Sequence, residues 1–183
     1  MIYPIVAYGD PVLRQTTREI DPADPQLDLK KLVADMYETM YAANGVGLAA
    51  PQIGLPLRLF VIDSTRMSEG GEGIKRAFVN PRLLSESGEA WPYEEGCLSI
   101  PNIREDVSRM TFIKIHSFDQ DWQEYEEEFD EVTARVIQHE YDHIEGILFT
   151  DHISPFKKTL LKSKLAKISK GKVKVDYRMR FPA

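Results

Sequence analysis

The sequence contains one stretch whose residue types and spacing can hold a metal ion and move a proton, Gln138-His139-Glu140-Tyr141-Asp142-His143. If this stretch is helical, His139 and His143 lie one turn apart on one face, which is the spacing that two imidazoles need to share a metal. Glu140 lies beside them and can accept a proton. Paired histidines on a solvated helix would show the same pattern, so the metal hypothesis depends on a third ligand elsewhere in the chain.

Three kinds of residue could supply that ligand. One is a glutamate on a distant helix, as in the thermolysin-like peptidases. Another is a third histidine in H-E-x-x-H-x-x-G-x-x-H, as in the metzincins, but this sequence follows that pattern only to Gly146 and has Phe149 at the diagnostic position. The third is Cys97, because a thiolate is a strong ligand for a borderline metal.

Cys97 could also be a buried free cysteine, which is the common fate of a lone cysteine. Its neighbours Glu95, Gly96 and Ser99 are not typical of plain core, and they favour the ligand interpretation.

The metal-binding stretch needs a helix to position it, and its flanks predict one. Asp130 is a suitable N-cap, and Gly146 follows the last helical residues as a stop signal. Counting back from His139 by threes and fours, the residues on the same face are Val132, Arg135 and Val136. Two valines beside the metal position indicate that a substrate group docked there is apolar.

Other elements can be predicted from periodicity and turn residues. Apolar residues at helical spacing predict a helix over 29–41, and the run at 57–63 predicts a buried strand. Residues 68–73 are typical of a hairpin tip, after which 77–81 resume the sheet and 85–94 resemble a loop. Ser154-Pro155 opens a last helix that ends before Gly171, and its predicted buried stripe consists of Phe156, Leu160, Leu161, Leu165 and Ile168.

Length and composition limit the classes of protein. A chain of 183 residues with 43% hydrophobic and 28% charged residues suits one globular domain. The apolar start, Met1–Ala7, lacks a basic beginning and ends too early for a signal peptide or a membrane span. Because Cys97 is the only cysteine, no intrachain disulfide can form, and a reducing, cytoplasmic location is the default expectation.

The net charge of −6 hides an asymmetry between body and tail. Residues 155–183 hold ten Lys or Arg and one acid, which gives +9, and residues 1–154 therefore carry −15. A basic tail on an acidic body indicates a polyanionic partner for the tail, although a solvated helix face would show the same composition.

Three stretches together resemble the peptide deformylase family. They are Gly45-Val46-Gly47-Leu48-Ala49-Ala50-Pro51-Gln52, Glu95-Gly96-Cys97-Leu98-Ser99, and the histidine stretch with Gly146. They occur in the order of the family's three motifs, and the resemblance extends over about residues 2–170. The segment from Gly171 onward is not covered by it.

The resemblance implies an α+β fold of one catalytic domain over residues 1–183, with a basic C-terminal helix and tail at about 154–183. Antiparallel sheets would pack around a central metal-binding helix, with an N-terminal and a C-terminal helix outside. The implied activity is removal of the N-formyl group from the N-terminal formylmethionine of newly made polypeptides. The ribosome surface is then the expected partner of the basic tail, and no membrane partner is expected.

The resemblance also implies roles for individual residues. Cys97, His139 and His143 would hold one divalent metal, which lowers the pKa of a water toward ~7. Iron(II) is favoured, and zinc, nickel or cobalt would suit the same donors. Glu140 would carry the proton. The Leu98 backbone N–H and the Gln52 side-chain amide would face the oxyanion that forms on the formyl carbon.

The substrate would lie extended beside Val46 and Gly47, in the manner of an added strand. By the family pattern, Glu95 and Arg104 pair at the edge of the pocket next to Gly96. The methionine side chain would enter a pocket lined by Val132 and Val136. Arg135 stands where relatives often carry an apolar residue, and it changes the expected shape and polarity of that pocket.

Two other functions fit parts of the sequence. A cysteine hydrolase would use Cys97 as nucleophile and a histidine as base, and its activity would survive chelators. An inactive relative would only bind ribosomal RNA through the basic tail, but the intact metal-ligand pattern and Glu140 argue against lost catalysis.

Overall fold

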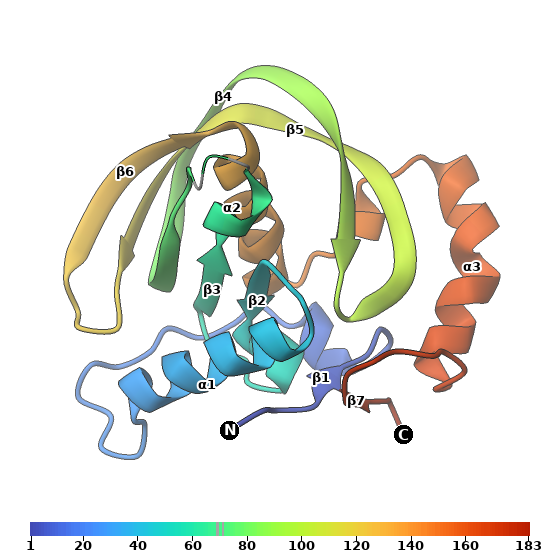
Figure 1. The fold of residues 1–183 in the computed structure, drawn as a ribbon, viewed down its shortest axis with the longest axis horizontal. Helices are drawn as coiled ribbons and strands as arrows, with labels where there is room; N and C mark the ends of the chain where they lie inside the picture. Colours follow the sequence, from blue (N-terminus) through green and yellow to red (C-terminus); the bar gives the residue numbers. More distant parts are fainter. Residues whose placement is uncertain (69, 71) are drawn as a thin grey trace.

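The computed structural model of the chain describes residues 1–68, 70 and 72–183, so that residues 69 and 71 of the predicted hairpin tip lie outside the described residues. The described part forms a five-stranded antiparallel sheet of order β2-β3-β4-β5-β6, a two-stranded parallel sheet β1-β7 and three α-helices (Figure 1). The helices are α1 (Leu29–Ala42), α2 (Glu131–Ile144) and α3 (Pro155–Ser169). The strands are β1 (Ile5–Val6), β2 (Gly47–Ala49), β3 (Leu59–Asp63), β4 (Lys75–Cys97), β5 (Ile100–Phe118), β6 (Glu124–Asp130) and β7 (Met179–Arg180). The short 3₁₀ helices are η1 (Pro11–Arg14), η2 (Ala50–Ile53), η3 (Ser64–Met67) and η4 (Phe149–Asp151). The predicted α+β class with an antiparallel sheet is confirmed, and the parallel β1-β7 pair is an addition to it.

Helix α2 lies inside the curve of the large sheet, where it packs against β2, β3, β5 and β6 (Figure 1). Its buried apolar side, with Ala134, Ile137 and Ile144, meets the aromatic rings of Phe60 and Phe78. As predicted, the helix begins after Asp130, and Gly146 follows it with a φ of 74°, which a glycine adopts without strain.

Strands β4 and β5 form a long hairpin that arches over α2 (Figure 1). The prediction of a loop over 85–94 is wrong, because these residues belong to β4. The register of β4 against β5 shifts three times between Val79 and Ala90, and residues 85–90 are exposed. A bulged strand with both faces in solvent has no apolar alternation to reveal it in the sequence.

The predicted first helix is confirmed as α1, and Asp28 caps it by accepting a hydrogen bond from the Lys31 N–H. Its buried face, which includes Leu32, Met36 and Met40, joins a core cluster with β2 and β3. The helix thereby fixes the segment 43–47 that leads into β2.

Helix α3 begins as predicted, with Ser154 as its N-cap and Pro155 in its first turn. Its predicted buried stripe is right at three of five positions. Leu161, Leu165 and Ile168 are buried, but Phe156 and Leu160 are 73% and 63% exposed. The body contacts α3 along a narrow line, so the next row of apolar residues lies outside the contact.

Candidate active site

Cys97, His139 and His143 meet at one point, although β4 supplies the first and α2 the other two. Their candidate ligand atoms all lie within 4.8 Å of one another, and Cys97 Sγ is 3.3 Å from His143 Nε2. One thiol and two imidazoles at this separation form a donor set that could hold a metal ion such as zinc or iron.

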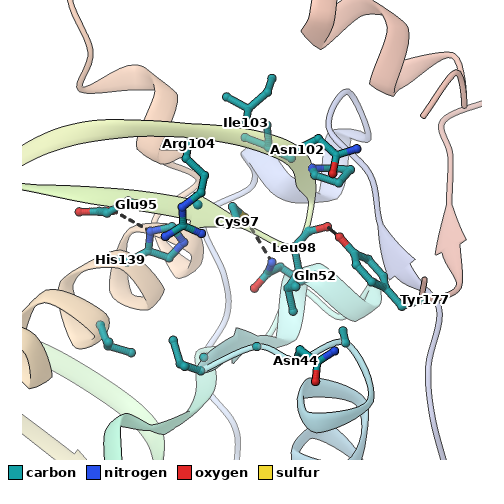
Figure 2. A pocket seen from close by; sticks show the side chains of 18 of the residues that line it. Asn44, Gln52, Glu95, Cys97, Leu98, Asn102, Ile103, Arg104, His139 and Tyr177 are labelled. Atoms are coloured by element: carbon teal, nitrogen blue, oxygen red, sulfur yellow. Dashed lines mark hydrogen bonds and ion pairs between the residues drawn. The ribbon is translucent and has the colours of Figure 1, made fainter. Parts of the chain in front are cut away.

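Glu95 fixes the orientation of His139. Its carboxylate accepts a hydrogen bond from His139 Nδ1 at 2.8 Å (Figure 2) and two from Arg109 at 2.7 and 3.0 Å. Burial raises the pKa of Glu95, but the hydrogen bonds from His139 and Arg109 outweigh it and hold the pKa well below its usual range. With Nδ1 engaged, His139 has Nε2 left for a ligand.

The electrostatics around Cys97 favour the thiolate. Burial raises the pKa of the Cys97 thiol, but the neighbouring His143 and His139 lower it to about 5. A sulfur that is negatively charged at neutral pH is ready to act as a ligand or as a nucleophile.

Glu140 is buried beside the three donors, and its Oε2 atom has no hydrogen-bond partner among the described residues. A Cβ at Gly47 would lie 2.5 Å from Glu140 Oε1, so only glycine lets β2 approach this carboxylate. Burial raises the pKa of Glu140, against the lowering effect of His139 and His143. A carboxylate with a raised pKa and an unused oxygen is suited to accept a proton.

Gln52 lies on the other side of the sulfur. Its Oε1 accepts a hydrogen bond from the Ala49 N–H at 3.0 Å. Its Nε2 points toward Cys97 Sγ at 3.5 Å (Figure 2) and donates to Ser99 Oγ at 3.1 Å. Leu98 follows Cys97 in the tight turn between β4 and β5.

A cleft of about 620 Å³ opens onto these groups. Of the predicted substrate-binding residues, Val132 is not among the described residues that line the cleft, although Val136 on the next turn is. The other predicted residues that line it are Val46, Gly47, Glu95, Gly96 and Arg104.

The predicted pairing of Glu95 with Arg104 is wrong. Arg104 is exposed and pairs with Glu94 at 2.9 Å, whereas Glu95 pairs with Arg109 and Arg135 inside the protein. In an antiparallel pair, residues directly opposite share a face, and Arg104 lies opposite Gly96. The alternation that buries Ile103 and Val107 on β5 could have shown that Arg109 also faces inward.

Arg135 is 2% exposed and lines the inner part of the cleft. Its guanidinium donates to Glu95 and to the backbone carbonyls of Val107 and Trp91, and it lies over the rings of Trp91 and Tyr93. The pocket wall is therefore part apolar and part cationic, as the position of Arg135 in the sequence indicated.

Comparisons with known proteins agree with this geometry. The family profile described as "Polypeptide deformylase" matches residues 2–159. The chain belongs to the polypeptide deformylase family. It is 57% identical over 183 residues to the peptide deformylase of Cytophaga hutchinsonii, with 100% of this chain and 98% of that protein covered. The peptide deformylase of Christiangramia forsetii is 52% identical over 192 residues, with 100% and 97% covered.

A solved structure, the peptide deformylase from Legionella pneumophila, has the same fold with a TM-score of 0.80 at 36% identity. The match covers 93% of this chain and 96% of the Legionella chain. Family membership carries the activity: the chain is a hydrolase that removes the N-formyl group from newly made polypeptides. Within the described ranges, no helix is long and apolar enough to cross a membrane.

Proposed function

We propose that residues 1–183 form one catalytic domain in which α2 is the central metal-binding helix, and that Cys97, His139 and His143 hold a single divalent ion. The convergence of these three donors carries the proposal. The donor set fits such an ion, because Glu95 engages the other nitrogen of His139 and the environment favours the Cys97 thiolate. When bound, the ion supplies Lewis-acid chemistry, polarising the formyl carbonyl and acidifying water.

Glu140 handles the proton in this proposal. It accepts a proton from the attacking water and returns it to the leaving amine as the formyl C–N bond breaks. Its raised pKa and its unpaired Oε2 support the role, since a higher proton affinity and a free oxygen both suit a group that accepts a proton.

The Gln52 side-chain amide and the Leu98 backbone N–H donate to the formyl oxygen as negative charge develops on it. Both lie next to Cys97 and are fixed by their surroundings, Gln52 through Ala49 and Ser99. Loss of one donor of this kind typically costs about 10²–10³ in turnover.

The peptide lies extended between β2 and the end of β4, with Val46 and Gly47 on one side and Gly96 on the other. Among the described strands, β2 pairs only with β3, and its other edge is open for backbone hydrogen bonds. The methionine side chain enters the inner cleft toward Val136 and Arg135. We assign no substrate contact to Val132.

Metal analysis combined with an activity assay tests this proposal. Protein purified without oxygen should contain about one equivalent of metal. The family resemblance favours iron(II), and the same donors would also accept zinc, nickel or cobalt. Chelation should abolish hydrolysis of a formyl-Met peptide, and added metal should restore it. Full activity after metal removal would support a Cys97 nucleophile instead. The proposal requires a reducing compartment such as the cytoplasm, because Cys97 binds metal only as a free thiolate.

The ribosome is a second proposed partner, supported by the surface of α3. The lysines on α3 and at its C-terminal end are all exposed, at positions 157, 158, 162, 164, 167 and 170. Phe156 and Leu160 add exposed apolar surface on the same helix. A basic surface with apolar side chains is suited to dock on ribosomal RNA, while the acidic body is repelled by it.

Charge reversal tests this partner. Lys162→Glu with Lys167→Glu should weaken ribosome binding and flatten its dependence on salt, but leave hydrolysis of a free formyl-Met peptide unchanged. A matched control reverses the same number of charges on the body, at Lys30 and Lys114. Equal loss in both double variants would mean that α3 has no special role.

A further inference from the structure

The two-residue turn Leu98-Ser99 sets the geometry of the site, because it joins Cys97 at the end of β4 to Ile100 at the start of β5. The backbone of Leu98 continues directly from Cys97. Cys97 is held in the sheet by its pairing with Ile100, so a rotation within the turn would reorient the Leu98 N–H and leave the thiol in place.

Three separate parts of the chain hold the turn. The Tyr177 hydroxyl donates to the Leu98 carbonyl at 2.7 Å (Figure 2), and the Tyr8 N–H donates to the Ser99 carbonyl at 2.9 Å. Gln52 donates to the Ser99 hydroxyl. The Leu98 side chain rests on Gly45, where an added Cβ would lie 2.8 Å from Leu98 Cδ1.

Two of these contacts come from opposite ends of the chain, and the ends are joined to each other. Strand β1 precedes Tyr8, strand β7 follows Tyr177, and the two strands pair in parallel. The Ile5 N–H donates to the Arg178 carbonyl at 2.9 Å, directly after Tyr177. The position of Tyr177 is therefore fixed by the paired ends of the chain.

The segment before β7 also borders the cleft. Residues 174–177 line it, and Asn102 on β5 donates to the Lys174 carbonyl at 3.1 Å. Figure 2 shows Tyr177 reaching from the C-terminal segment to Leu98, on the side of the cleft away from His139. The family profile ends at residue 159, before this segment begins.

We propose that Tyr177 is a positioning residue for deformylation, which holds the Leu98 carbonyl so that the Leu98 N–H faces the formyl oxygen. The inference rests on the role proposed above for Leu98. Tyr177 itself does not touch the substrate's reacting atoms. It acts through the backbone of the turn.

The chemistry of Tyr177 suits a permanent contact. Its ring packs against the same core cluster as Leu98, and this packing holds the hydroxyl in position. Burial raises the pKa of Tyr177, and the hydroxyl therefore remains a donor at neutral pH. A small displacement of a donor aimed at a transition state is costly, since a misplacement of about 1 Å can reduce the rate about 10²-fold.

The test is Tyr177→Phe, which removes the hydroxyl and keeps the ring. We expect kcat for a formyl-Met peptide to fall about tenfold with KM changed less than about twofold, the pattern of a contact that acts in the transition state. Metal content should stay at the wild-type value. In ¹⁵N spectra, the amide signals of Leu98 and Ser99 should shift. Tyr125→Phe is the matched control, because Tyr125 on β6 lies outside the cleft lining, and this variant should match wild type in every measurement.

Wild-type kcat together with unmoved Leu98 signals in Tyr177→Phe would overturn the inference. Loss of metal in parallel with activity would also overturn it, because Tyr177 would then support the metal site and not the oxyanion donor. Different results would contradict the proposed function. In that case the wild-type protein would hydrolyse the peptide without metal, or Glu140→Ala would retain activity.

Discussion

Helices α2 and α3 have almost the same length, fourteen and fifteen residues, but they treat polar and apolar side chains in opposite ways. Helix α2 buries Arg135, His139 and Glu140, whereas α3 exposes Phe156 and Leu160. Burying charged groups and exposing large apolar groups both cost free energy, so each calls for a functional reason. The comparison indicates that the functional surface of α2 faces the cleft, whereas that of α3 faces the solvent.

The buried polar groups of α2 are stable because most of them have partners. Arg135 and His139 share the carboxylate of Glu95. Four buried side-chain atoms of α2 lack a partner among the described residues, and one of them is Glu140 Oε2. A buried carboxylate oxygen without a partner is costly, and its place beside the metal donors gives a reason for it.

The largest expected effect that tests this comparison is that of Glu140→Ala. Loss of the proton carrier should lower kcat by about three orders of magnitude, while the three donors still retain the metal. Peptide hydrolysis and metal analysis of the same sample measure both quantities. Near wild-type turnover would mean that α2 buries Glu140 for another reason.

The next largest effect is expected on metal affinity, from a change at Cys97, the third donor beside the two α2 histidines. Cys97→Ser should weaken metal retention, because a serine hydroxyl is a poor ligand at neutral pH. We expect a loss of affinity larger than the roughly 10–100-fold that follows removal of an outer hydrogen-bond partner. Competition with a chelator measures it, and full occupancy with normal activity would remove Cys97 from the metal site.

Arg135→Met should lower the stability of the protein more than it lowers the rate of the reaction. It removes three hydrogen bonds, one of them to the buried Glu95, and we expect a loss of about 2–3 kcal/mol in the free energy of unfolding. The KM for formyl-Met peptides should also change, because the inner cleft becomes apolar. Denaturant unfolding and steady-state kinetics separate the two effects, and an unchanged stability would show that Arg135 is not a structural contact.

The smallest effect is expected on α3. Phe156→Ser with Leu160→Ser should change the free energy of unfolding by less than about 0.5 kcal/mol, because both side chains are already in solvent. Leu161→Ala, one residue further and buried, should cost about 2–3 kcal/mol. If the double variant were the more destabilised of the two, the exposed row of α3 would be part of the core after all.

Prediction from sequence succeeded where local spacing carries the information. The positions of His139 and His143 one turn apart, the start of α3 at Ser154-Pro155, and the glycine after α2 all follow from rules that act within a few residues. Ligand chemistry made Cys97 a candidate third ligand, but only the family resemblance joined it to the histidines, because 41 residues of unknown path lie between Cys97 and His139.

Tertiary structure decided which residues of each element are covered by a neighbouring element and which residues pair across strands. Periodicity could list the apolar residues of α3, but only packing determined that Leu161 is covered and Leu160 is not. The family pattern suggested Arg104 as the partner of Glu95, but the register of β4 against β5 turns Arg104 away and Arg109 takes that place. The contact of Tyr177 with Leu98 bridges 79 residues, and it exists because β7 pairs with β1. Contacts of this kind depend on register and on which elements pack together, and no short-range pattern in the sequence encodes them.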